Sequence, residues 1–183
     1  MAARADQVAQ TRLRIVEATV ALHGTLGPAH TTVAAIAESA GVTRLTVYRH
    51  FQDSDALFAA CTGHWAAQQQ MPNLDAWRAE ADPATRLRVA LTDLYRFYAQ
   101  AEPMLTRIHR DRDALPEFVQ RRNDATDAAQ VEAVQSAWSR RQRTNSRRAL
   151  IAHALAFSTW RSVCFEHGLA ADQAVAAMVR LVN

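Results

Sequence analysis

The sequence predicts an all-α fold, and three of its properties support that prediction. The chain has 183 residues, of which 49% are hydrophobic, so it is long and apolar enough to bury a core. Only five glycines and five prolines interrupt it. It shows no sustained strand-like alternation and none of the Asn-Gly or Asp-Gly pairs that join hairpins. We therefore expect helices joined by short turns.

Four helices are predicted near the N-terminus. Apolar residues recur at helical spacing over 6–23, and Gly24 followed by Gly27-Pro28 ends that stretch. Two short helices over 33–40 and 43–51 flank Gly41, and a longer helix runs over 54–70.

The rest of the chain predicts a second, larger helical part. A weakly periodic stretch around Trp77 leads to Asp82-Pro83, which opens an amphipathic helix ending near Gln100. Pro103 and Pro116 each suit the first turn of a helix, where the missing amide donor costs least. The helices that follow from these prolines cover 103–111 and 116–140.

Two further helices are expected at the C-terminus. The stretch 145–166 is apolar almost all round and 171–182 is apolar on one side, so both need a buried surface or one shared with a second copy. Charged residues or His break every apolar run before it reaches the length of a membrane span, so no membrane association is expected.

The cytoplasm is the expected location. The first residues lack the apolar region and cleavage site of an export signal. Cys61 and Cys164 are far apart and indicate buried thiols rather than a disulfide framework. Of the His and Cys spacings, only Cys164 with His167 suits ligation on one helix face, and one pair does not make a metal site. We expect neither a metal nor a cofactor.

The segment 32–51 has the features of a helix-turn-helix. Thr32 and Thr43 are placed to cap the two short helices, and Gly41 supplies the left-handed conformation that ends the first of them. The apolar residues that would form the small core between the helices are Val33, Ile36, Ala37, Ala40, Val42, Val47 and Phe51.

The remaining side chains of the second short helix point outward and are mostly polar. They are Arg44, Thr46, Tyr48, Arg49 and His50, whose donors suit base edges and phosphates in a major groove. An alternative is a helical hairpin inside some other bundle, with Tyr48 and Phe51 as core aromatics. The polar outer face and the turn geometry favour DNA binding.

Residues 11–65 resemble the DNA-binding domain of the TetR family of bacterial regulators. The resemblance rests on Ile15 and Ala18, on the segments 32–37 and 40–43, and on Val47-Tyr48-Arg49-His50-Phe51 followed by Asp55-Ala56-Leu57-Phe58. It implies a homodimer that binds double-stranded DNA, with an N-terminal helix-turn-helix domain over 1–55 and a helical ligand-binding and dimerisation domain over 56–183. It also implies repression that a small-molecule effector relieves.

The resemblance further implies roles for single residues. Arg44 would read a base, Thr46 would contact a base or phosphate, and Tyr48, His50 and Thr32 would contact phosphate. Thr43, Leu45 and Arg49 complete the predicted DNA-binding set, in which Leu45 is bulkier than is usual in the family and suits a thymine methyl. Ser54 stands where the family commonly has Lys, so one phosphate contact is expected to be weaker.

An effector site is expected among the aromatic and polar residues of the second part. The candidates are Tyr95, Tyr98, Met104, His109, Trp138, His153, Phe157 and Trp160. The plain alternative for each is core packing, since aromatics at helical spacing are usually core. A fully packed body that acts through protein partners, with no ligand, is therefore a second hypothesis for the whole protein.

The charge pattern adds little support for an enzyme. Asp111, Asp113, Asp124 and Asp127 lie among arginines, which we interpret as mixed charge on a solvated helix face rather than as acid–base groups. No phosphate-binding loop, nucleophile elbow or Cys-His dyad is visible, so a helical enzyme ranks last. The net charge is +3 and all 21 basic residues are Arg, which suits phosphate and guanine, although high-GC coding explains most of this bias.

Overall fold

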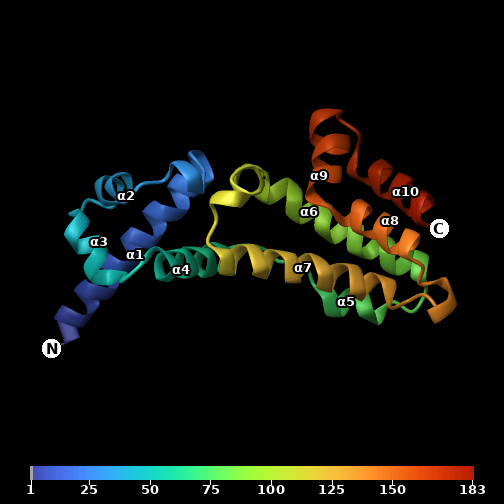
Figure 1. Ribbon diagram of the computed structural model, residues 1–183, viewed down its shortest axis with the longest axis horizontal. Helices are drawn as coiled ribbons and strands as arrows, with labels where there is room; N and C mark the ends of the chain where they lie inside the picture. Colours follow the sequence, from blue (N-terminus) through green and yellow to red (C-terminus); the bar gives the residue numbers. More distant parts are fainter. Residues whose placement is uncertain (1) are drawn as a thin grey trace. The chain divides into compact units, whose positions relative to one another are not determined.

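The computed structural model describes residues 2–183, with side chains from Arg4 onward (Figure 1). Met1, the first residue of the predicted DNA-binding domain, lies outside the described residues. Within this range the chain forms ten α-helices and no strand, so the predicted all-α fold is confirmed.

The chain folds into two compact units, each built from two stretches of sequence. The first unit comprises the residues up to Gln69 together with Glu102–Gln120. The second unit comprises Gln70–Ala101 and Arg121–Asn183. The long helices α6 (Pro83–Arg110) and α7 (Glu117–Gln135) therefore contribute residues to both units.

The first unit contains four helices near the N-terminus and a short segment from the middle of the chain. Its elements are α1 (Ala2–Thr25), the 3-10 turn η1 (Pro28–His30), α2 (Val33–Ser39), α3 (Arg44–His50), α4 (Ser54–Ala67), the end of α6, the 3-10 turn η2 (Arg112–Ala114) and the start of α7. The four predicted N-terminal helices are all present, with ends shifted by a few residues.

A small apolar core holds α1 to α4 together. α1 packs against α2 and α4, and α2 packs against α3. The buried core residues are Ile15, Val16, Ala18, Ile36, Ala37, Ala40, Val47, Phe51, Leu57 and Cys61. The helix-turn-helix is therefore fixed on one side by α1, which leaves the opposite side of α3 open to solvent.

Two arginines near the end of α6 satisfy carbonyl groups at the end of α1. Arg107 Nε donates to the Thr25 carbonyl at 2.7 Å, and Arg110 Nη2 donates to the Leu26 carbonyl at 2.7 Å. The last carbonyls of a helix have no partner within the helix, and cations near them are favourable. These two arginines and Asp111, which follows them, are called the α1 clamp below.

Asp111 is buried, contrary to the prediction of a solvated charged face. Its carboxylate accepts hydrogen bonds from the Ala29 amide at 3.1 Å and from Arg110 Nε at 2.6 Å. The bond from Arg110, assisted by that from Ala29, holds the pKa of Asp111 below its ordinary value. The sequence pattern missed this role because the partner amide lies 82 residues earlier in the chain.

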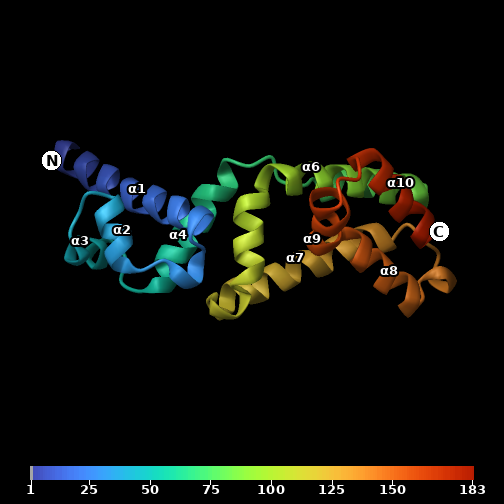
Figure 2. The same ribbon diagram turned by 90° about the horizontal axis from the view of Figure 1, so that it is seen from above.

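The second unit contains the remaining helices. They are α5 (Leu74–Ala79), most of α6 and α7, the 3-10 turn η3 (Arg140–Gln142), α8 (Asn145–Leu155), α9 (Phe157–Trp160), the π-helical turn η4 (Arg161–Glu166) and α10 (Ala171–Val182) (Figure 2). The largest side chains that it buries completely are Trp77, Leu87, Leu91, Leu94, Tyr95, Val134 and Ile151. The stretch around Trp77 is thus a short helix whose indole is in the core, with Nε1 donating to Asp93 at 2.9 Å.

The predicted helix over 103–111 is wrong, because α6 continues through Pro103 to Arg110. A proline inside a helix removes one backbone hydrogen bond and crowds the carbonyl four residues earlier. Here Pro103 and Ala99 are both exposed, so water is able to solvate the freed carbonyl. The helix predicted over 116–140 is present as α7, but it ends at Gln135.

The single helix predicted over 145–166 is also wrong, because the chain leaves the helical conformation at Ala156 (φ −67°, ψ 140°). Tertiary hydrogen bonds stabilise this break. Tyr95 donates from its hydroxyl to the Ala154 carbonyl at 3.0 Å, and Tyr98 donates to the Leu155 carbonyl at 2.7 Å. The last predicted helix, over 171–182, is confirmed as α10.

Among residues 2–183, no helix combines the length and the apolar character needed to cross a membrane.

Candidate nucleic-acid interface

The turn between α2 and α3 is built from local hydrogen bonds that the sequence predicted. Thr32 Oγ1 accepts from the Ala35 amide and Thr43 Oγ1 accepts from the Thr46 amide, each at 3.2 Å, so both predicted N-caps are confirmed. Gly41 has φ 64°, a left-handed conformation that a side chain would strain. These contacts fix the direction in which α3 leaves the turn.

The inner side of α3 is anchored in the core of the first unit. Val47 is 2% exposed and Phe51 is 3% exposed, and both belong to the same cluster as Ile36 of α2. Arg12 of α1 places its guanidinium carbon 4.3 Å from the centre of the Phe51 ring. The two short helices therefore form one rigid element with α1.

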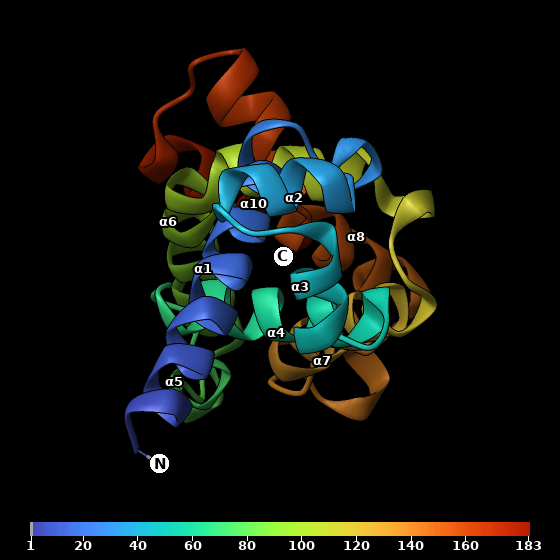
Figure 3. The ribbon, with the colours of Figure 1, turned by 90° about the vertical axis from the view of Figure 1, so that its left-hand side faces the viewer.

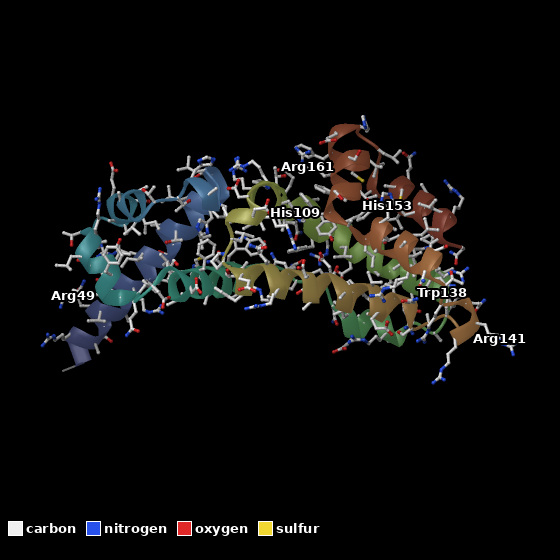
Figure 4. All side chains as sticks on the ribbon, in the orientation of Figure 1. Arg49, His109, Trp138, Arg141, His153 and Arg161 are labelled. Carbon is white, nitrogen blue, oxygen red and sulfur yellow. The ribbon has the colours of Figure 1, made fainter. Side chains whose placement is uncertain are left out.

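The outer side of α3 carries the side chains predicted to contact DNA. Leu45 is 68% exposed and Tyr48 is 57% exposed, and Arg44 and Arg49 are also exposed. In Figure 3 the connection from α2 to α3 faces the viewer, and Figure 4 labels Arg49 on α3. A short helix that presents two arginines, a phenol and an apolar side chain has the donors and the methyl-contacting surface that major-groove recognition requires.

The other predicted contact residues surround this helix. Thr46 and His50 are half-buried at its edge, and Thr32 and Thr43 are exposed at the starts of α2 and α3. The hydroxyls of Thr43 and Thr46 also lie 2.9 Å apart, in hydrogen-bond contact. The structure thus brings the predicted DNA-binding residues together on α2 and α3.

The beginning of α4 is less suited to phosphate than the sequence pattern alone suggested. Ser54 is exposed at the first position of α4, and the carboxylate of Asp53 caps that helix by accepting from the Ala56 amide at 2.7 Å. Asp55 is exposed beside it. Two carboxylates at this position disfavour an approaching phosphate, so we expect the phosphate contact here to be weaker than the presence of Ser54 alone implies.

Two arginines of α1 adjoin the motif and were missed in the sequence. Arg12 lies over Phe51, and Arg14 lies beside Gly41, with its Nη1 3.9 Å from the point where a Cβ would stand. Both are exposed. Neither residue belongs to the helix-turn-helix segment. Their closeness to it became visible only when the structure showed that α1 packs against α2.

Residues 15–61 match the family model described as bacterial regulatory proteins, tetR family. These residues are therefore a TetR-type DNA-binding domain. The matched residues extend from α1 to α4 and include the whole helix-turn-helix. The resemblance seen in the sequence is therefore confirmed over residues 15–61.

Solved structures are similar in fold over nearly the whole chain. A TetR-like transcriptional regulator from Rhodococcus sp. RHA1 is similar with a TM-score of 0.62 and 18% identity, covering 94% of this chain and 93% of that one. A Clostridium perfringens protein named for regulation of fatty acid metabolism has a TM-score of 0.60 and 16% identity, covering 92% and 96%. At such identities the likeness establishes the fold alone. No curated protein matches the sequence.

Four of the predicted ligand residues form one aromatic cluster in the second unit. Tyr95, Tyr98, Phe157 and Trp160 are each at most 7% exposed, and the Tyr98 ring packs edge-on against Phe157 with centroids 5.4 Å apart. Because both tyrosine hydroxyls donate to carbonyls of α8, neither has a donor left for an effector. Their contacts are those of core residues, and their ligand roles stay predictions.

The other predicted ligand residues lie outside this cluster. Trp138 is buried after the end of α7, and its ring lies 5.5 Å from the guanidinium carbon of Arg147. His153 is exposed on α8, with Nδ1 3.3 Å from the Thr159 hydroxyl, and His109 belongs to the first unit (Figure 4). Met104, half-buried, also belongs to the first unit. No group of three or more His, Cys, Asp or Glu side chains among the described residues is placed to hold a metal ion.

Proposed function

We propose that this chain is a TetR-family regulator, a homodimeric repressor that binds a palindromic operator and that a small-molecule effector releases. The observation that carries the proposal is the outer side of α3, where Arg44, Leu45, Tyr48 and Arg49 are exposed above a capped and rigid turn. We assign operator binding to residues 1–55 and effector binding with dimerisation to 56–183, and we place the protein in the cytoplasm, where the operator is. Cys61 and Cys164 are both free thiols, in keeping with a reducing compartment.

Dimerisation is supported by apolar surface near the C-terminus. Leu181 on α10 is 47% exposed, Phe165 at the end of η4 is 55% exposed and Leu169 just before α10 is 38% exposed. Side chains of this size are usually covered in a soluble protein when they cluster on adjoining elements. A twofold dimer would cover them and would present two copies of α3 to half-sites about one DNA turn, ~34 Å, apart.

Release by an effector is supported by the way α6 is used. This helix supplies buried aromatic residues to the second unit, and its last turn supplies the α1 clamp to the first unit. A ligand that favours one position of α6 would therefore act on the end of α1, and a small shift in half-site spacing would remove one α3 from its groove.

A second candidate is a regulator whose body acts through protein partners and binds no effector. The tightly packed aromatic cluster favours it, because the hydroxyls of Tyr95 and Tyr98 are already bonded within the chain. Binding of a small molecule by the full-length dimer would exclude this candidate.

The proposal is tested by selecting duplexes from a random DNA pool with the parent and with two variants. Arg44→Ala should relax the selected sequence, with about 1–3 kcal/mol of discrimination lost at one position of each half-site. Tyr48→Phe should weaken binding to all duplexes alike, because a phosphate contact carries no sequence information. Arg88→Ala, which removes an exposed arginine of the second unit, is the matched control and should bind as the parent does. Unchanged specificity and affinity in both α3 variants would refute the role of α3.

A further inference from the structure

A hollow of about 280 Å³ lies in the second unit, where α7 and α8 line it. Its apolar walls include Val131 and Leu155, and none of the predicted ligand residues contributes to it. The volume is just below the usual range for ligand sites, which is about 300–1,000 Å³. The hollow therefore suits a small compound and has no role in the DNA contacts described above.

Gln130 is the polar residue that distinguishes this hollow from an ordinary surface depression. The residue is 8% exposed, yet no hydrogen bond of its side-chain amide is found among the described residues. Every fully enclosed side-chain nitrogen or oxygen in the described part of the chain does have a partner. The amide of Gln130 must therefore keep contact with open space, and the hollow that it lines provides that space. Because this amide makes no hydrogen bond within the chain, both its donor and its acceptor are available to a ligand in the hollow.

The charged groups at the hollow are already compensated. Arg148 Nη1 donates to Gln135 Oε1 at 3.2 Å and lies 3.8 Å from a carboxylate oxygen of Glu132. Asp127, the one acidic residue of the lining, also has an interaction partner within the chain. One positive and one negative group with partners of their own leave no unmatched charge for an ionic ligand to neutralise.

We propose that the hollow binds an uncharged, mostly apolar small molecule that carries one amide or lactam group, which pairs with the side-chain amide of Gln130. An amide offers one donor edge and one acceptor, which complements the carboxamide of glutamine, and the rest of the molecule would lie against Val131 and Leu155. This inference rests on the proposed function in one respect, because it supplies the chemical class of the effector.

The position of the hollow also indicates how occupancy reaches the backbone. Leu155 and Ala156 both line it, and they are the residues at which α8 ends and the chain leaves the helical conformation. The Leu155 carbonyl is in turn bonded to the Tyr98 hydroxyl of α6. A molecule in the hollow would thus contact the residues at which α8 ends, and the carbonyl of one of them, Leu155, accepts a hydrogen bond from Tyr98 of α6.

The test uses full-length regulator labelled with ¹⁵N and three probes of similar shape: benzamide, benzoate and ethylbenzene. Benzamide should shift the side-chain NH₂ resonances of Gln130 in a saturable way, and benzoate and ethylbenzene should bind about tenfold more weakly or not at all. Gln130→Leu should lower the affinity for benzamide about tenfold, and Ala152→Phe, which fills the hollow, should abolish binding. Gln69→Leu, at a half-buried glutamine of the first unit, is the matched control and should leave the affinity unchanged.

Several results would overturn the inference. One is stronger binding of benzoate than of benzamide, and another is equal benzamide affinity in the parent and in Gln130→Leu. A third is a shift of the Gln130 resonances with protein concentration and not with probe, which would mean that a second copy covers the hollow. A melting temperature of Gln130→Leu well below the parent's would also contradict it, because an unpaired amide contributes no stabilising bond. Binding of the operator is measured separately, without probe. If the parent binds no operator, the proposed function is refuted, and the resonance shifts still show whether benzamide binds in the hollow.

Discussion

Replacing Gly27 by alanine should destabilise the first unit more than any other glycine-to-alanine change in it. Gly27 has φ 94° and ψ 159°, a conformation found almost only in glycine and costing a side chain about 1–3 kcal/mol. A Cβ at this position would also stand 2.3 Å from Arg110 Nη2 and 2.3 Å from Asp111 Oδ2. Both groups belong to the α1 clamp, so the methyl group must displace the clamp as well as strain the backbone.

Two other glycines separate these two effects. At Gly41, φ is 64° and the nearest atom to an added Cβ is Arg14 Nη1 at 3.9 Å, so Gly41→Ala tests backbone strain alone and should cost about 1–2 kcal/mol. Gly63 is helical with nothing within 4 Å of an added Cβ, so Gly63→Ala should stabilise by about 0.5–1 kcal/mol. We expect Gly27→Ala to cost at least about 2 kcal/mol.

The assay is urea unfolding of the three variants and the parent at equal protein concentration, followed by circular dichroism. Changes in midpoint at constant slope give the differences in the free energy of unfolding. Equal protein concentration matters because the stability of the proposed dimer would depend on it. A Gly27→Ala variant no less stable than Gly41→Ala would refute the reasoning, because the contacts of the clamp would then impose no constraint on residue 27.

Two further predictions concern buried polar groups. Burial lowers the pKa of His23 to about 4, against a partial opposing effect of Asp111, so its neutral form is favoured in the folded state. The neutral imidazole therefore contributes its full stabilisation above the unfolded pKa of about 6.5, and this stabilisation is lost as the pH falls toward 4. Urea unfolding of the parent should show a loss of about 2–3 kcal/mol near pH 4.5. His23→Leu should lack this loss, and the exposed His167→Gln is the control. Tyr98→Phe should lower the free energy of unfolding by about 1–3 kcal/mol, because it leaves the Leu155 carbonyl buried without its donor. Tyr48→Phe, on the exposed face of α3, should change the free energy of unfolding little. Similar stability of the two variants would contradict the capping role of Tyr98.

The helix-turn-helix was predictable because its determinants are close together in sequence. The caps formed by Thr32 and Thr43 each join residues three apart, and Gly41 ends α2 through its own backbone conformation. Such signals survive without knowledge of the tertiary fold. For the same reason the apolar inner face of α3 and its polar outer face followed from helical periodicity alone.

The break at Ala156 was not predictable in this way. Neither glycine nor proline stands there, and the segment on both sides is apolar at helical spacing. The helix ends because hydroxyls of Tyr95 and Tyr98, nearly sixty residues earlier, bond the carbonyls of Ala154 and Leu155. Sequence periodicity carries no information on such partners, and it led to the interpretation of the two phenols as ligand candidates.

The α1 clamp has a consequence for how the protein is made. The DNA-binding half needs Arg107, Arg110 and Asp111 to bond the end of α1, yet these residues leave the ribosome some eighty positions after their partners. The end of α1 and the start of η1 are therefore bonded only to water until more than half of the polypeptide has been synthesised, although the core of the first four helices needs no residue beyond Cys61. A truncated message that stops after α4 would yield a peptide with an intact recognition helix and an unfinished support.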